Sequence, residues 1–425
     1  MDKNNGAIYD ARKLGKPKMI ILGVQHMFAM FGATILVPIL TGLDISTTLL
    51  MAGLGTLLFH CITKFKVPAF LGSSFAFLGG YAAIKAFSPN DPNSMLPYAC
   101  LGVACAGLIY FILAAVIKAV GIEKVMRFFP PVVTGPIIIA IGLGLAPSAV
   151  SNCTTNWFLA VVALAVIVVF NIWGKGMAKI IPIILGLLIS YGTGLVLYFI
   201  SQANPDLIQN VPWLFSGGAD ANGVYQPIFD FTSLNTICDN ISKGHIFGSE
   251  GLIGIPIHWD KTVFGGIDYS NGALIASSII AIVPIAFATM MEHIGDICAI
   301  SSTTGNNYIK DPGLHRTLVG DGLATTLASL FGGPANTTYG ENTGVLALTR
   351  VYDPRVIRIA AYFAVAVSFF PIVSVIIGSI PSCIIGGISF VLYGMISAIG
   401  VRNVVENRVD FTKSRNLIVA AVILV

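Results

Sequence analysis

Charge is what this sequence has least of. Only 10% of its 425 residues are Asp, Glu, Lys or Arg, whereas about 25% of the residues of a soluble protein are charged. Hydrophobic residues make up 55% of the chain, and the mean hydropathy is +0.84. This balance excludes a soluble globular fold. It predicts an all-α polytopic membrane protein, with the lipid bilayer as its surroundings.

Metal-binding and disulfide patterns are also missing. The seven Cys are scattered singly, and the sequence contains neither CxxC nor HExxH. We therefore expect no disulfide framework, no zinc site and no cofactor. The net charge of +4 does not indicate nucleic-acid binding. No cleavable signal peptide is expected either, because the polar start, residues 1–18, leads directly into a full-length apolar segment.

Long apolar segments are what the sequence has in abundance. About 20 apolar residues in a helix cross a bilayer. The predicted segments are 19–41, 46–63, 71–87, 97–117, 131–148, 157–173, 180–201, 272–291, 317–332, 335–350, 356–378, 383–400 and one that begins at Asn416. Two of them, 71–87 and 335–350, are shorter and interrupted. The last is too short to cross, so we expect the sequence to be truncated at its C-terminus.

The basic residues orient these spans. With residues 1–18 in the cytoplasm and the spans alternating, 21 of the 24 Lys and Arg residues fall on the cytoplasmic side. Such asymmetry follows the positive-inside rule. It predicts a protein of the cytoplasmic membrane with its N-terminus inside.

A long polar segment, 202–271, separates two halves of similar layout. It is rich in Gly, Asn, Asp and Pro, and we interpret it as an extracellular insert, either a tolerated insertion or a lid. Seven spans precede it, and the third span of each half is interrupted. An odd number of spans makes the repeats inverted, and matching helix breaks indicate a transporter site near the membrane midplane.

The break in the second half carries a carboxylate. Glu341 at membrane depth costs roughly 2.5–3.5 kcal/mol on insertion scales, so we expect it to face a cavity or a partner. Gly340 lets another group approach the backbone, and a half-helix starting here presents free N–H groups. The carboxylate and the free N–H groups together suit a ligand with alternating N–H and C=O groups. A helix kink with internal hydrogen bonds is the alternative.

The break in the first half, Pro68–Phe77, supplies a second half-helix that Ser73 or Ser74 can cap. Phe75 can stack on a planar ring, or it can simply pack within the membrane.

Other ionisable residues lie in the predicted spans. Glu292 and Asp296 are four residues apart and share a helical face, so one can contact substrate while the other titrates; a solvated helix end is the alternative. His26, next to Gln25, is either a structural hydrogen-bonding group or directed to the site. We interpret His60 as structural and Asp321 as a capping or supporting residue.

At these residues the chain resembles the nucleobase–ascorbate transporter family, and within it the bacterial uracil permeases. The family signature is Gln, Glu or Pro, then Asn, any residue, Gly, four residues, Thr and usually Arg or Lys. The matching residues are Glu341, Asn342, Gly344, Thr349 and Arg350. Further matches are Gln25-His26, Gly72–Phe75 and Asp311–Arg316. The resemblance covers the chain from about Lys18 onward, apart from the insert.

The resemblance implies fourteen segments in two inverted repeats of seven, with short antiparallel strands in spans 3 and 10. It implies a core domain, 19–120 and 272–378, and a gate domain, 121–201 and 379–425. Uptake of uracil would be proton-linked and would proceed by an elevator-like movement of core against gate, in a possible homodimer through the gate.

The resemblance also implies residue roles. Uracil would be held by the carboxylates of Glu292 and Glu341 and by the backbone amides of Phe75 and Gly340. Other positions matching the family's pocket are Ala33, Tyr339 and Tyr393, with His26 reaching it through water. One departure concerns coupling: the uracil permease pattern has a His four residues after the first carboxylate, where this chain has Asp296. An acid can still titrate, so we expect Asp296 and Glu292 to carry the proton, while sodium coupling stays open.

Four alternatives remain. A purine or xanthine permease of the same family and a sodium-coupled or uncoupled carrier are the near ones. A passive channel or receptor would show no accumulation of substrate. An intramembrane enzyme using Glu292, His293 and His26 would have no need of two matching helix breaks, so we expect no enzyme.

Overall fold

The computed structural model describes residues 7–121, 124, 130–220 and 222–424. Internal contacts divide the chain into two compact units, each built from two separate stretches. Unit 1 comprises the described residues of Met1–Phe128 and Ile246–Ser374, and unit 2 those of Phe129–His245 and Val375–Val425. Part of the predicted N-terminal segment 1–18, and Arg127 of the charge map, lie outside the described residues.

Unit 1 is helical apart from two short strands. In chain order its elements are η1 (Ala11–Leu14), α1 (Lys16–Thr41), α2 (Ile45–Ile62), β1 (Leu71–Ser73), α3 (Leu78–Lys85), η2 (Pro92–Met95), α4 (Leu96–Val120), η4 (Trp259–Lys261), α12 (Val263–Gly266), α13 (Gly272–Ile282), α14 (Ile285–Thr304), η5 (Ile309–Gly313), α15 (Leu314–Leu330), β4 (Asn336–Thr338), α16 (Gly340–Thr349) and α17 (Pro354–Ser368).

Unit 2 is also helical, with one small hairpin. Its elements are α6 (Pro131–Cys153), α7 (Trp157–Trp173), η3 (Gly176–Lys179), α8 (Pro182–Ala203), α9 (Asp206–Asn210), α10 (Pro212–Phe215), β2 (Ser216–Ala219), β3 (Tyr225–Pro227), α11 (Thr232–Ser242), α19 (Ser382–Glu406) and α20 (Ser414–Leu424). Helix α18 (Pro371–Gly378) crosses the boundary between the units.

Local sequence sets several helix ends. Helix α1 ends at Gly42, whose φ of 86° is a left-handed conformation that favours glycine. Asp44 then caps α2, because its Oδ1 accepts the backbone N–H of Thr47 at 2.7 Å. In unit 2, Asn156 caps α7 by accepting the N–H of Leu159 at 3.1 Å. These caps mark the boundaries between successive apolar helices.

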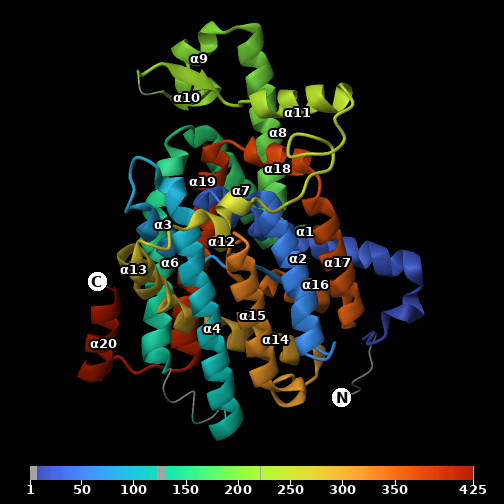
Figure 1. Cartoon of the computed structure of the whole chain (residues 1–425), viewed down its shortest axis with the longest axis vertical. Helices are drawn as coiled ribbons and strands as arrows, with labels where there is room; N and C mark the ends of the chain where they lie inside the picture. Colours follow the sequence, from blue (N-terminus) through green and yellow to red (C-terminus); the bar gives the residue numbers. More distant parts are fainter. Residues whose placement is uncertain (1–6, 122–123, 125–129, 221, 425) are drawn as a thin grey trace. The chain divides into compact units, whose positions relative to one another are not determined.

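Helix α15 packs between α2 and α4 in unit 1 (Figure 1). The contact with α4 includes two glycines that face each other. A Cβ added to Gly107 would lie 2.7 Å from the carbonyl oxygen of Gly322, and one added to Gly322 would lie 2.6 Å from that of Gly107. Small residues of this kind let membrane helices approach closely.

Substitution Gly322→Leu is therefore expected to destabilise unit 1. The added side chain meets the Cβ of Tyr110 at 2.5 Å and the Gly107 carbonyl oxygen at 2.6 Å. Neither atom is the far end of a flexible side chain, so α4 and α15 must separate, at a cost of ~1–3 kcal/mol or more. The apparent melting temperature in detergent is the measurement. Gly144→Leu is the matched control, because nothing lies within 4 Å of a Cβ built at Gly144. Equal losses in the two variants would contradict the close-contact argument.

Part of the predicted insert folds onto unit 2. Segments α9 to α11 follow the end of α8 (Figure 1). Four aromatic rings join them: Phe229 stacks on Phe231 with ring centroids 5.2 Å apart and meets Tyr191 and Tyr198 edge-on at 4.8 and 5.9 Å. The rest of the insert, from Ile246, belongs to unit 1. The insert is thus ordered over its described residues and is divided between the units.

Helices cover most of the predicted spans, but 157–173 and 317–332 form α7 and α15, of 17 residues each, which are shorter than the seven described helices that could cross a membrane. Seven helices in the described part of the chain are long and apolar enough to cross a membrane, or eight if α17 and α18 count together. Predicted span 356–378 is divided into α17 and α18, bent by 86°. Pro371 explains the break, because proline disfavours helical conformation in the residue before it. Predicted span 272–291 extends to Thr304 as α13 and α14.

Candidate functional site

The two interrupted segments pair with each other inside unit 1. Strands β1 and β4 are antiparallel, with Leu71 opposite Thr338 and Ser73 opposite Asn336. The pairing continues past the strands, because Ser74 N–H donates to the carbonyl of Ala335 at 2.8 Å and the N–H of Tyr339 donates to Phe70 at 3.0 Å. Short antiparallel strands in the two broken spans are thereby confirmed.

Strands β1 and β4 form a two-stranded ribbon, and neighbouring helices complete its hydrogen bonding. Thr56 of α2 accepts the N–H of Leu71 at 2.9 Å. The Asn336 side chain also donates to Met51 O of α2 at 3.0 Å, and Thr325 of α15 donates to the carbonyl of Asn336 at 2.7 Å. Non-helical backbone at membrane depth requires such internal partners. The ribbon is therefore held in unit 1 by hydrogen bonds with α2 and α15.

Helix α16 starts directly after the ribbon. Tyr339 occupies its N-cap position in an extended conformation, without a side-chain capping bond. Gly340 is exposed, and nothing lies within 4 Å of a Cβ built there. Glu341 follows in the first turn and is half-buried. The N-terminus of α16 therefore presents backbone donors and a carboxylate beside open space.

Helix α14 places two further carboxylates against this region, since it packs on both α16 and β4. Glu292 is exposed and Asp296 is half-buried. Thr338 Oγ1 donates to Asp296 Oδ2 at 2.7 Å, which ties the acid directly to the ribbon. The structure thus brings Glu292, Asp296 and Glu341 to one part of unit 1.

His26 of α1 is fully buried and contacts α16. The Nδ2 of Asn342 lies 3.1 Å from His26 Nδ1 and also donates to the His26 carbonyl at 3.1 Å. An amide donor at Nδ1 places the proton of a neutral imidazole on Nε2. That Nε2 has no protein partner among the described residues, nor has Asn342 Oδ1. His26 therefore holds the signature Asn through its ring Nδ1 and its backbone carbonyl.

Two predicted pocket positions lie in packed surroundings. The Tyr339 hydroxyl donates to Ser73 O at 2.9 Å and accepts from Thr34 at 3.3 Å. Ala33, next to Thr34, is 1% exposed. A Cβ on Gly72 would meet the Tyr339 ring at 2.4 Å, so only glycine fits there. Tyr339 therefore joins α1 to the ribbon.

The two remaining predicted positions, Phe75 and Tyr393, belong to different units. Phe75 lies half-buried between β1 and α3, where its carbonyl accepts the N–H of Leu78 at 3.1 Å. Tyr393 is a buried residue of α19 and so belongs to unit 2. Within the described ranges, no group of three or more His, Cys, Asp or Glu side chains is arranged to hold a metal ion.

Sequence reasoning missed one buried pair. His293 Nδ1 lies 3.1 Å from Asp321 Oδ2, and both side chains are 0% exposed. The Phe59 ring meets the His293 ring edge-on at 6.2 Å. His293 follows Glu292 directly, so its side chain is rotated by about 100° around α14, and it is buried while Glu292 is exposed. The available signal for this pair was Asp321, an acid in the apolar segment that forms α15. Its partner could not be identified from the sequence, because it depends on how α14 and α15 pack.

Comparisons with known proteins agree with this architecture. The family model Xan_ur_permease, described as a permease family, matches residues 17–425. A uracil permease of Bacillus caldolyticus is 39% identical over 417 residues, covering 96% of this chain and 84% of the relative. A uracil permease of Bacillus subtilis (strain 168) is 38% identical over 419 residues, with the same coverage.

Among solved structures, the transmembrane domain of the cyanobacterium bicarbonate transporter BicA shares the fold. The TM-score is 0.65 at 12% sequence identity, over 98% of this chain and 96% of that one. Identity this low supports the fold alone. With a family match from residue 17 onward and relatives near 40% identity, the chain belongs to the nucleobase–ascorbate transporter family and is a multi-pass plasma-membrane transporter rather than an enzyme.

Proposed function

We propose that this chain takes up uracil in symport with protons, with unit 1 as the core that moves against unit 2 as the gate. The proposal includes an N-terminus on the cytoplasmic side and a homodimer formed through the gate. The relatives named uracil permease support the choice of substrate. The charge asymmetry of the sequence supports the orientation.

One observation carries the substrate assignment: the carboxylate of Glu341 lies beside the uncapped N-terminus of α16. The edge of a uracil ring alternates N–H and C=O groups. A carboxylate accepts from the ring N–H, and backbone amides at a helix N-terminus donate to the carbonyl oxygens. Glu292 of α14 supplies a second acceptor in the same part of unit 1.

The proposed proton site is Asp296. Its hydrogen bond from Thr338 connects a titratable group to the strand that leads into α16. As a carboxylate, Asp296 accepts from Thr338; once protonated, it gains a donor of its own, and the hydrogen-bonding arrangement at β4 changes. A protonation event is thus linked to the backbone that positions Gly340 and Glu341.

Purified protein in lipid vesicles tests the whole proposal. We expect radiolabelled uracil to accumulate when the vesicle interior is made alkaline, and to stop accumulating when a proton ionophore collapses the gradient. Unlabelled uracil should compete, whereas xanthine and hypoxanthine should not. Competition by the purines without competition by uracil would overturn the substrate. Accumulation that survives the ionophore but requires sodium would overturn the coupling ion.

A further inference from the structure

Residues Ile8–Leu14, which precede α1, form a strap across the turn between α16 and α17. Backbone hydrogen bonds hold its first residue: Ile8 N–H donates to Arg350 O, and Tyr352 N–H donates to Ile8 O, each at 2.8 Å. Arg350 is the C-cap of α16. The N-terminal strap therefore attaches to the residues that end the helix carrying Glu341.

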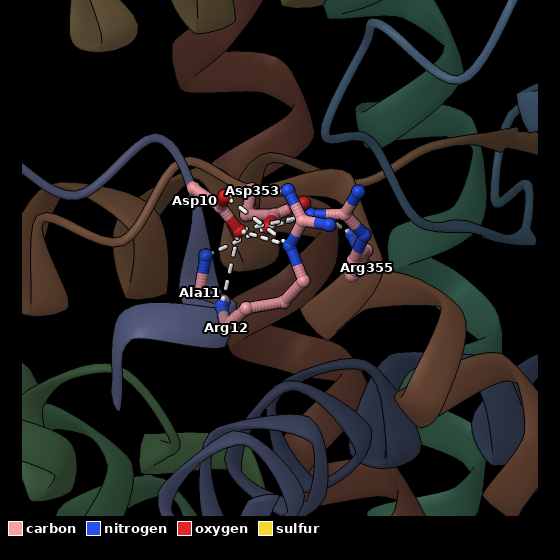
Figure 2. A network of polar contacts seen from close by, with 5 residues as sticks. All are labelled: Asp10, Ala11, Arg12, Asp353 and Arg355. Atoms are coloured by element: carbon pink, nitrogen blue, oxygen red, sulfur yellow. Dashed lines mark hydrogen bonds and ion pairs between the residues drawn. The ribbon is translucent and has the colours of Figure 1, made fainter. Parts of the chain in front are cut away.

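A network of two acids and two arginines fastens the strap (Figure 2). Asp10 accepts from Arg12 Nη2 at 2.7 Å and from Arg355 Nη1 at 3.0 Å. Asp353 Oδ2 accepts the backbone N–H of Ala11 at 2.7 Å and Arg355 Nη1 at 3.1 Å. The Asp353 side chain is 5% exposed. Each charge in the network therefore has an opposite partner, and one partner is shielded from solvent.

The strap also reaches the second carboxylate helix. The Tyr9 hydroxyl donates to the carbonyl of Thr304 at 2.7 Å, and Thr304 is the last residue of α14. The Tyr9 ring meets the Tyr352 ring edge-on, with centroids 5.5 Å apart. One short segment thus binds the C-terminal ends of both α14 and α16.

Apolar packing supports these polar contacts. Ala11, Val351 and Val356 form a buried cluster, against which lie the partly buried Ile8, Leu14, Met19 and Leu22. The cluster joins the strap to the turn before α17 and to the first turns of α1. The strap is therefore part of the packed structure of unit 1.

We infer that the N-terminal strap sets the relative axial position of α14 and α16, and hence of the Glu292 and Glu341 carboxylates. At 1.5 Å per residue, Glu292 is about 18 Å from the strapped end of α14, and Glu341 is about 12 Å from the end of α16. The strap thus touches no substrate. Its residues are positioning residues, and the inference rests on the proposed function of the two carboxylates.

Between pH 5 and 8, solution pH does not break the ion pairs that Asp10 makes in the strap. The hydrogen bond from the Arg12 side chain, with the charge of Arg355, holds the pKa of Asp10 well below its usual range. A lowered pKa means that the interaction is complete above the ordinary carboxyl value of about 4 and is lost only in stronger acid. The groups facing Asp10 are Arg12 and Arg355, with Asp353 beyond them. Strap variants should therefore leave the pH profile of uptake unchanged between pH 5 and 8.

The double variant Tyr9→Phe, Asp353→Asn tests the inference. Phe removes the hydrogen bond from the Tyr9 hydroxyl to Thr304. Asn removes the negative charge that faces the Ala11 N–H and the Arg355 guanidinium, while it can still cap α17. In reconstituted vesicles we expect the KM for uracil to rise about three- to tenfold, with Vmax within about twofold and the pH profile unshifted. Asp410→Asn, an acidic turn residue in unit 2 bonded to Thr412, is the matched control and should behave as wild type.

Hydrogen exchange separates this inference from the proposed function. Amides of 340–349 should exchange faster in the double variant than in the wild type, whether or not uracil is transported. Unchanged exchange and unchanged KM would overturn the strap's role. A wild type that takes up no uracil would overturn the proposed function, and faster exchange in the variant would then still support the strap. A loss of Vmax at constant KM would also overturn the positioning role.

Discussion

Glu341→Gln is expected to lose proton-driven accumulation of uracil. Gln keeps the shape of the side chain, but it removes the charge that accepts the ring N–H and can direct an N–H donor at it instead. A hydrogen bond to a charged group is worth ~1.5–3 kcal/mol, which corresponds to an affinity loss of about 10- to 150-fold. Uracil binding to purified protein and accumulation in vesicles measure the two effects.

A matched carboxylate elsewhere provides the control for Glu341. Glu406, at the C-terminal end of α19, is 66% exposed and lies 3.5 Å from Arg402. Glu406→Gln removes the same charge from an exposed pair of little energetic weight, so uptake should stay at the wild-type level. Retained accumulation in Glu341→Gln would refute the role given to this carboxylate.

Asp296→Asn is expected to separate binding from coupling. Asn has nearly the same volume, and its carbonyl oxygen can accept the hydroxyl of Thr338, so the ribbon and α16 keep their geometry. It cannot bind and release a proton. We therefore expect uracil binding and exchange of uracil across the membrane to persist within severalfold, while accumulation driven by a pH gradient disappears.

Two further variants sharpen this prediction. Asp296→Glu retains a titratable group and should keep part of the gradient-driven uptake. Thr338→Val removes the hydrogen bond but not the acid, so it should shift the pH dependence of uptake without abolishing coupling. Full gradient-driven accumulation in Asp296→Asn would show that the proton is carried elsewhere. Glu292, the other predicted proton carrier, is then the next group to examine, followed by the buried pair of His293 and Asp321.

Much of the fold could be predicted because its signals are local. Apolar runs give the spans, and caps such as Asp44 and Asn156 give their ends. The interruptions at 71–87 and 335–350 were likewise visible, since a stretch rich in small polar residues and glycine does not form a lipid-facing helix. Both contain a strand followed by a helix. The bend before Pro371 had a local signal as well, although the hydropathy of 356–378 is continuous.

Other features have no local signal. His293 and Asp321 are 28 positions apart, and nothing in either neighbourhood specifies the partner; only the packing of α14 against α15 does. The N-terminal strap looked like a polar leader whose basic residues mark topology. Its role emerges from contacts with residues more than 290 positions away.

The sequence by itself determined the class of protein, the places where two helices must break, and the carboxylate at one of them. Hydropathy and the conformational limits of proline and glycine act residue by residue, so those features are readable without a fold. The tertiary structure decided that the two breaks pair as one ribbon, that Asp296 binds Thr338, and that the strap joins α14 to α16. Backbone and ionisable groups in an apolar medium need partners, and residues distant in the chain become partners only when the helices pack.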